Sequence, residues 1–143
     1  MSDELQRADE WIKARCAADV SLTGIVAARL YSSVVPDTGS FPCVLFGYLG
    51  GFDARGTGTI RILHSGLWLI RAVADTRDWG GQLGLATDRL DAIFDRAPSG
   101  LVGADATVFT ATRDQPYREI EPLTGGGERR HAGGIYRLLI QRS

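Results

Sequence analysis

Few residues in this sequence could perform acid–base or nucleophilic chemistry. The two histidines are His64, expected beside a hairpin turn, and His131, expected in a glycine-rich loop, so neither has an obvious partner to orient it. Ser65 follows His64 directly, but adjacent strand residues point to opposite faces, so the two do not form a nucleophile–base pair. Cys43 could meet His64 across neighbouring strands, yet the surrounding run CVLFGYL is typical of a buried strand, where a thiol is not activated.

Paired carboxylates are also weakly indicated. Asp75 and Asp78 lie three positions apart, but Asp75 ends an expected strand and Asp78 is a good helix N-cap. Arg71 and Arg77 are close enough in sequence to neutralise them. We therefore interpret these two aspartates as structural residues.

Motifs for cofactors and metals are missing from the sequence. The glycines at 47, 50 and 51 do not follow the G-x-G-x-x-G spacing, and there is no Walker sequence, zinc-ligand spacing or EF-hand loop. The sequence predicts a protein that is not an enzyme, with no catalytic residues, no cofactor and no bound metal.

Charge and composition argue against a general affinity for nucleic acid or anionic lipid. The 143 residues carry a formal net charge of −1, and 44% of them are hydrophobic, which is ordinary for a globular domain. No expected helix has a basic stripe. Arg129 and Arg130 are adjacent and could touch phosphate, but Glu128 partly balances them. Two arginines in a loop do not predict a nucleic-acid site.

The cysteines and the N-terminus bear on where the protein is made. Cys16 and Cys43 form neither a disulfide framework nor a metal site and are expected to be small buried residues. After Met1 the sequence SDELQRADEW lacks the basic and apolar parts of a secretory signal, and no apolar run is long enough to span a bilayer. We expect synthesis in the cytoplasm and no contact with a membrane.

Two main helices are predicted by periodic apolar residues. Residues 3–19 and about 78–95 each carry one apolar stripe, and residues 22–28 favour an additional short helical turn. Trp11 lies off the centre of the first stripe, so it is a candidate contact to another chain, with packing over the edge of its own sheet as the alternative. The stripes consist of Leu5, Ala8, Ile12 and Cys16 in the first helix, and Leu83, Ala86, Leu90 and Ile93 in the second.

Strands are predicted by short apolar or alternating segments bounded by Gly, Pro, Asp and Ser. Residues 43–49 are apolar on both faces, which favours an interior strand. The alternating segments on either side of Ser65–Gly66 predict an antiparallel hairpin with its turn at that pair. Inward side chains are expected at Trp68, Ile70, Ala72 and Ala74, and at Tyr136, Leu138 and Ile140. The expected strands are residues 30–35, 43–49, 57–64, 67–74, 106–112, 117–121 and 134–141.

Glycine-rich or proline-rich stretches predict loops at 50–58, 98–103 and 124–134, of which the last is too rich in glycine to be ordered by its own contacts. Together the elements predict an α+β fold, a mostly antiparallel twisted β-sheet with two main α-helices packed on one face, in a single domain over residues 1–143. The charged and aromatic residues set among the loop glycines are Phe52, Asp53, Arg55, Glu128, Arg129 and Arg130.

Several short segments in order resemble the tail-terminator (tail-completion) proteins of long-tailed, siphovirus-like bacteriophages. They cover about residues 20–141 and carry no catalytic signature. Departures from the pattern are a longer charged N-terminal helix and the loops at 98–104 and 124–134. The segments are Arg-x-Tyr at 29–31, Val-Pro at 35–36, Phe-Pro-x-Val at 41–44, the strand end at 73–75, LxxATDRLDAIF at 83–94, and GIYRLLIQ at 134–141.

The resemblance implies a small α+β virion subunit that forms a homo-oligomeric ring, often a hexamer, on the head-proximal end of the tail tube. Such a ring ends tube polymerisation and joins the tail to the head connector. Its implied partners are other copies of itself, the tail tube protein and the head-closure or connector protein, with DNA passing only transiently through the lumen. The candidate contacts to subunits or tube are Trp11, Phe52, Asp53, Arg55, Glu128, Arg129 and Arg130.

Two other functions remain open at this point. A head-closure or head–tail connector protein of the phage neck would bind the portal assembly instead of the tube. A small-ligand-binding α+β domain would curl its sheet around a pocket beneath Trp68 and Phe109.

Overall fold

The computed structural model describes residues 3–37, 39–55, 61–95, 100–101 and 106–142. In these ranges the chain forms three helices and six strands, which begin and end as follows. The helices are α1 (Asp3–Ala18), α2 (Val20–Val26) and α3 (Gly81–Phe94), and the strands are β1 (Leu30–Ser32), β2 (Cys43–Arg55), β3 (Arg61–Ala74), β4 (Gly100–Leu101), β5 (Ala106–Pro122) and β6 (Glu128–Arg142).

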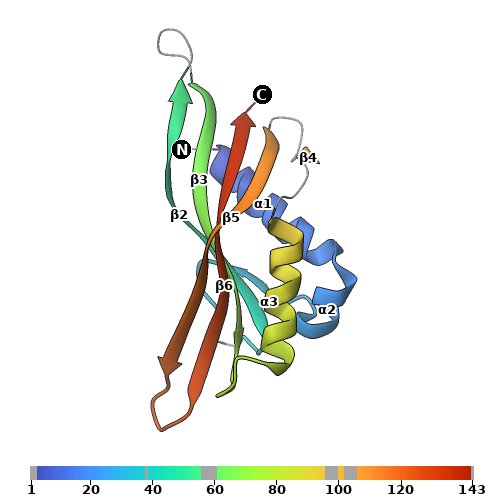
Figure 1. The fold of residues 1–143 in the computed structure, drawn as a ribbon, viewed down its shortest axis with the longest axis vertical. Coiled ribbons are helices and arrows are strands. Elements are labelled where there is room, and N and C mark those ends of the chain that lie inside the picture. Colours follow the sequence, from blue (N-terminus) through green and yellow to red (C-terminus); the bar gives the residue numbers. More distant parts are fainter. Residues whose placement is uncertain (1–2, 38, 56–60, 96–99, 102–105, 143) are drawn as a thin grey trace.

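The strands form one sheet in the order β1-β2-β3-β6-β5-β4. The β1–β2 pair is parallel and every other pair is antiparallel. Figure 1 shows the helices on one side of a strongly twisted sheet. The predicted α+β class is therefore confirmed, and the short helical turn predicted at residues 22–28 is present as helix α2 at Val20–Val26.

Two long hairpins extend from the middle of the sheet in opposite directions (Figure 1). One is β2 with β3, paired from Cys43↔Val73 to Arg55↔Arg61. The other is β5 with β6, paired from Ala106↔Arg142 to Pro122↔Glu128. The lower end of the β5–β6 hairpin and the upper end of the β2–β3 hairpin project past the helices, so both are exposed on more than one side.

The main core lies between the sheet and the helices, as the alternation in the strands predicts. The side chains of Trp68, Ile70 and Ala72 are 0% exposed, and Tyr136, Leu138 and Ile140 face the same layer. The predicted stripes of α1 and α3 are also buried there, with Leu5 at the margin. A smaller cluster, Cys43, Leu45 and Val73, lies on the opposite face of the sheet against residues of the 31–41 segment.

The N-terminus of α3 differs from the prediction. Its N-cap is Gly80, and Asp78 lies two residues earlier, where its Oδ1 accepts the Gly80 N–H at 3.2 Å. Asp78 therefore stabilises the turn that leads into the helix instead of capping it, and helix α3 begins three residues later than the periodicity indicated.

The predicted turn at Ser65–Gly66 is wrong, because both residues lie inside the continuous strand β3. A Cβ on Gly66 would lie 2.4 Å from the indole of Trp68, so this glycine leaves space for an aromatic ring on the same face. Gly134 does the same for Tyr136, whose ring lies 3.0 Å from the position of a Cβ. Glycine in a strand can mark a close approach as readily as a turn.

The predicted loops at 50–58 and 124–134 are also largely strand. Residues 50–55 continue β2, and β6 begins at Glu128, which leaves only residues 123–127 as the turn between β5 and β6. The strands expected at 106–112 and 117–121 are one strand, β5, with an irregularity between Arg113 and Gln115. Residues 56–60 and most of the predicted loop at 98–103 lie outside the described residues, apart from the short strand β4.

None of the helices in the described ranges is both long enough and apolar enough to cross a membrane.

Candidate assembly interface

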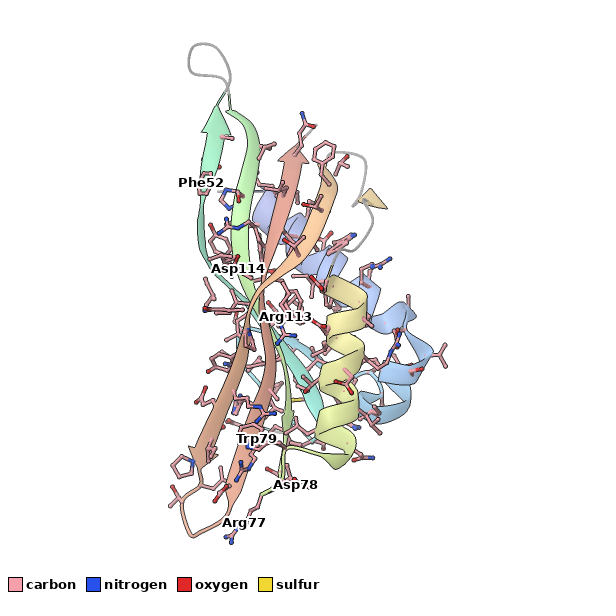
Figure 2. The ribbon with its side chains drawn as sticks, viewed as in Figure 1. Phe52, Arg77, Asp78, Trp79, Arg113 and Asp114 are labelled. Atoms are coloured by element: carbon pink, nitrogen blue, oxygen red, sulfur yellow. The ribbon has the colours of Figure 1, made fainter. Side chains whose placement is uncertain are left out.

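The predicted contact residues of the first hairpin lie in strand β2. Phe52 is 61% exposed and lies on the face of the sheet opposite the helices, because it pairs with Ser65, whereas Asp53 pairs with His64 on the helix side. Figure 2 shows Phe52 near one end of the molecule, well away from Trp79. The backbone of Arg55 ends β2, and its side chain lies outside the described residues.

His64 is held by two partners, neither of which was evident from the sequence. Its Nδ1 lies 2.9 Å from Asp53 Oδ1, and its Nε2 lies 2.9 Å from the Tyr48 hydroxyl. His64 is 8% exposed and packs edge-on to Trp68. Burial, followed by the Asp53 charge, raises the pKa of Tyr48. The trio links β2 and β3 near the outer end of their hairpin.

The same arrangement excludes the Cys43–His64 pair as a reactive site. Cys43 is opposite Val73, at the other end of β2 from the Asp53–His64 pair. Burial raises the pKa of the Cys43 thiol to about 11, so it is protonated at neutral pH. Cys43 and Cys16 are both free and buried, as predicted.

The second hairpin holds its charged residues in contacts within the chain. Arg129 Nε lies 2.9 Å from Asp75 Oδ1, and its guanidinium lies 4.1 Å from the Phe41 ring centroid. Arg130 pairs with Glu128 at 3.1 Å. Asp75 is therefore neutralised by Arg129, not by Arg71 or Arg77, which sequence proximity favoured. Glu128, Arg129 and Arg130 are ordered strand residues, not members of a flexible loop.

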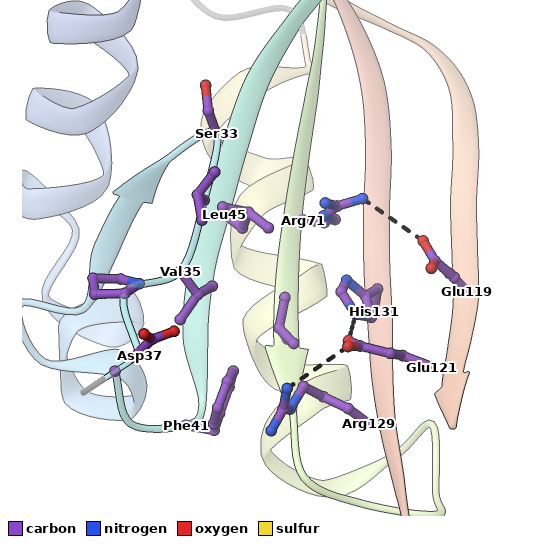
Figure 3. A pocket seen from close by; sticks show the side chains of 14 residues that line it. Ser33, Val35, Asp37, Phe41, Leu45, Arg71, Glu119, Glu121, Arg129 and His131 are labelled. Atoms are coloured by element: carbon purple, nitrogen blue, oxygen red, sulfur yellow. Dashed lines mark hydrogen bonds and ion pairs between the residues drawn. The ribbon is translucent and has the colours of Figure 1, made fainter. Parts of the chain in front are cut away.

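A groove of about 560 Å³ runs between this hairpin and the 33–41 segment, on the sheet face without helices. Figure 3 shows Arg71 paired with Glu119, and Glu121 between His131 and Arg129. His131 Nε2 lies 2.8 Å from Glu121 Oε1 and the ring is 6% exposed, so the second histidine also has a partner. A hydrogen bond from Tyr117 is the main cause that lowers the pKa of Glu119.

Trp79 lies on the helix side of this hairpin, between two arginines. The Cζ atoms of Arg118 and Arg130 each lie 4.6 Å from its ring centroid. Figure 2 shows Trp79 with Arg77 and Asp78 beside the lower hairpin. Stacked guanidinium groups lose mobility, so the hairpin presents a fixed pattern of charge.

Trp11 packs inside its own subunit, the second of the two alternatives that the sequence left open. It is 5% exposed, and its ring meets Phe94 edge-on at 5.8 Å between centroids. Trp68 is also buried in the core, and its Nε1–H donates to Asp9 at 3.0 Å. Phe109, in contrast, is 41% exposed.

Paired ionisable side chains and exposed apolar side chains occupy the two hairpins. Within the described ranges, no group of three His, Cys, Asp or Glu residues is placed to hold a metal ion. The two glutamates of the groove pair with Arg71, Arg129 and His131. Sequence reasoning missed Tyr48, Tyr117 and Glu119, because only the register of the strands shows that they lie beside His64 and Arg71.

Comparison with known proteins identifies a solved structure with a similar fold. No protein-family model matches the sequence, and no curated protein matches it. Among solved structures, the chain is similar to a chain from the virion of a native gene transfer agent particle, with a TM-score of 0.66 and 16% identity over 91% of each chain. A second solved structure has a TM-score of 0.48 and 16% identity, over 100% of this chain and 96% of its own. At this identity the first likeness shows a shared fold.

Proposed function

We propose that this chain is a structural, non-enzymatic protein of a phage-like virion. In that role it forms a ring, of six copies, at the head-proximal end of the tail tube, where it ends tube polymerisation and joins the tail to the head connector. The observation that carries the proposal is the fold shared with a chain of a gene transfer agent virion along 91% of both chains. It agrees with the tail-terminator resemblance of the sequence.

The surface supports the same role. A ring requires two different patches on each copy, so that contacts close head to tail. The two hairpins extend in opposite directions and leave most of one sheet face without helices. Exposed apolar side chains lie on both hairpins, among them Leu49, Phe52 and Ile120. Apolar residues so exposed favour burial against a partner.

The experiment is the assembly of a phage tail tube protein into tubes in the presence of this chain. Tubes would be grown with and without the purified protein and measured by negative-stain electron microscopy. We expect shorter tubes with ring density at one end only. Unchanged tube lengths and bare ends would overturn the proposal, and binding to the portal assembly instead would favour the head-closure alternative.

A matched pair of variants makes the test specific to the surface. Phe52→Asp places a charge on the exposed end of the β2–β3 hairpin, whereas Val20→Asp changes a residue that is 83% exposed on α2. We expect Phe52→Asp to abolish rings and tube capping and Val20→Asp to leave both intact. Equal behaviour of the two variants would remove the hairpin from the interface.

A further inference from the structure

The sheet has two open edges, one on each long hairpin. Strand β1 pairs with residues 44–46 of β2, and strand β4 pairs with residues 107–108 of β5. Within the described residues no strand covers the rest of either edge, which is 47–55 of β2 and 109–122 of β5. Figure 1 shows the open segment of β2 toward the upper end of the molecule, and the open segment of β5 running from the upper part down to the lower end. An uncovered edge is a template for another strand.

The pattern of hydrogen bonds between the strands shows which backbone N–H and C=O groups on each edge point away from the sheet. Val44 N–H donates to Arg29 O, so the backbone of Val44 faces β1. In antiparallel pairs, residues that exchange hydrogen bonds alternate with residues that do not. Along the row Val44–Ala72–Ala132–Arg118 this alternation points the N–H and C=O of Arg118 away from the sheet. By the same alternation, the N–H and C=O of Asp53, which pairs with His64, also point away from the sheet.

An independent hydrogen bond confirms the outward direction on β5. The N–H of Arg113 donates to Asp95 Oδ1 at 2.9 Å, outside the sheet. From there the outward positions on β5 include Pro116, Arg118, Ile120 and Pro122. The two prolines have no N–H to offer, so they bound a segment at the lower end of this edge, residues 117–121, in which every N–H is available for pairing.

We call residues 117–121 the β5 window, meaning the segment free to pair with another strand. The open edge of β2 has a window of the same length. Register shifts occur between Tyr48 and Gly50 and between Ala54 and Arg55, and they leave residues 50–54 as a regular segment. Gly51 and Asp53 direct their backbone groups outward in it, as Arg118 and Ile120 do on β5. Each window therefore offers two residues that can exchange hydrogen bonds with a new strand.

Strand direction allows the two windows to meet in neighbouring copies. From β2 the successive neighbours β3, β6 and β5 are each antiparallel, so β5 runs opposite to β2. A second copy in the same orientation, displaced along the strands so that its residues 117–121 reach residues 50–54 of the first, brings its β5 antiparallel to β2, with both helix layers on the same side. Cyclic symmetry keeps that relation at every contact.

We propose that residues 50–54 of one copy pair antiparallel with residues 117–121 of the next, so that the sheets of the ring join edge to edge. This inference rests on the ring of the proposed function. Full overlap of the two windows places Gly51 opposite Ile120, Phe52 opposite Glu119 and Asp53 opposite Arg118. The last pair brings opposite charges together on the helix side of the sheet.

Exposed side chains along the two edges favour this contact. Tyr48, Leu49 and Phe52 on β2 are 38%, 53% and 61% exposed, and Ile120 on β5 is 50% exposed. In the paired arrangement Ile120 lies over Gly51, which has no side chain to obstruct it. A Cβ on Gly51 would come within 2.2 Å of Ser65 O, so the position is confined to glycine by the subunit itself.

Disulfide trapping tests the register. Phe52 and Glu119 would be a non-hydrogen-bonded pair with Cα atoms about 4.5 Å apart, a separation that a disulfide can bridge. The double variant Phe52→Cys/Glu119→Cys should give a ladder of covalent oligomers up to ring size on a non-reducing gel. The control Phe52→Cys/Asp114→Cys, on the same strands beyond Pro116, should give none. Cys16 and Cys43 are both 0% exposed and add no background.

A backbone variant tests the hydrogen bonds themselves. Ile120→Pro removes an N–H that points away from the sheet and leaves the β5–β6 ladder intact, whereas Ile120→Ala removes the side chain and keeps the N–H. We expect at least a tenfold greater loss of oligomer affinity for the proline variant than for alanine, by sedimentation across a concentration series. Circular dichroism of both variants checks that the subunit is folded.

The outcomes separate this inference from the proposed function. Rings that form without the trapped ladder, or with the Asp114 control trapped equally, would overturn the edge pairing and leave the ring role standing. A trapped ladder from copies that form open filaments and never cap a tube would support the pairing and overturn the terminator role. A protein that stays monomeric at all concentrations would overturn both.

Discussion

The carboxylate of Asp19 joins two helices: it caps α2 and binds an arginine of α3. Its Oδ1 accepts the Leu22 N–H at 2.8 Å and the Arg89 Nε–H at 3.2 Å, and its Oδ2 lies 2.5 Å from Arg89 Nη2. Asp19 is thus both a local cap and a link between segments 70 positions apart in sequence. The hydrogen bonds from Arg89 are the main cause that lowers the pKa of Asp19.

Replacing Asp19 by alanine should destabilise the protein measurably. Loss of a side-chain N-cap costs about 1 kcal/mol, with a range of about 0.5–2 kcal/mol, and the link to Arg89 is lost as well. Asp19→Asn keeps an oxygen for the Leu22 N–H, so we expect it to cost less than Asp19→Ala. Urea unfolding followed by circular dichroism gives the comparison, and equal losses for the two variants would exclude a capping contribution.

The lowered pKa of Asp19 predicts a pH dependence with a definite sign. A carboxyl whose pKa is lower in the folded than in the unfolded state adds stability above its unfolded pKa, about 3.9, and loses it as pH falls through the folded pKa. The difference in unfolding free energy between the natural protein and Asp19→Asn should be constant near neutral pH and shrink in acid. A difference that does not change with pH would contradict the assignment.

Asp9 should behave in the opposite way. Burial raises its pKa, although the hydrogen bond from Trp68 acts against that rise. A raised pKa means that the charged form costs stability at neutral pH, and that the cost disappears as pH falls below the unfolded pKa. Asp9→Asn removes the charge and keeps an acceptor for the Trp68 indole. We expect this variant to be at least as stable as the natural protein at pH 7, with the advantage vanishing in acid.

Much of the fold could be predicted from the sequence, because burial imposes periodicity on helices and strands. The stripes of α1 and α3 and the inward residues of β3 and β6 are where alternation placed them. The predicted turns are wrong where a glycine makes room for an aromatic ring and does not reverse the chain. Gly66 and Gly134 lie beneath the rings of Trp68 and Tyr136, and a single sequence does not distinguish such a glycine from one in a turn.

The partners of the ionisable residues depend on strand register, which the sequence left open. His64 meets Asp53 only because β2 continues past its glycines, and Arg129 meets Asp75 across strands that are far apart in sequence. Because residues 50–55 and 128–134 were predicted to be loops, their charged residues were assigned to contacts with other subunits or the tube and not to pairs within the chain. A one-residue change of register moves every side chain to the opposite face.

Helix α3 offers a matched test of core packing. Leu90 is 0% exposed in the main core and Leu85 is 60% exposed on the same helix. Leu90→Ala should lower the free energy of unfolding by about 2–5 kcal/mol, because it leaves a cavity. Leu85→Ala should change it by no more than about 0.5 kcal/mol. Chemical denaturation measures both, and a small effect at Leu90 would mean that the core collapses around the deletion.

Two glycines should respond in opposite directions to the same substitution. A Cβ on Gly133 would lie 2.2 Å from Ile70 O and 2.6 Å from Arg71 Cα, so Gly133→Ala must push β6 away from β3. Such overpacking typically costs about 1–3 kcal/mol. A Cβ on Gly24, in α2, would meet nothing within 4 Å, and alanine is the better helix former by about 0.5–1 kcal/mol. In thermal and urea unfolding, Gly133→Ala should therefore be less stable than the natural protein and Gly24→Ala more stable. A Gly133→Ala variant as stable as the natural protein would contradict the close approach of the two strands.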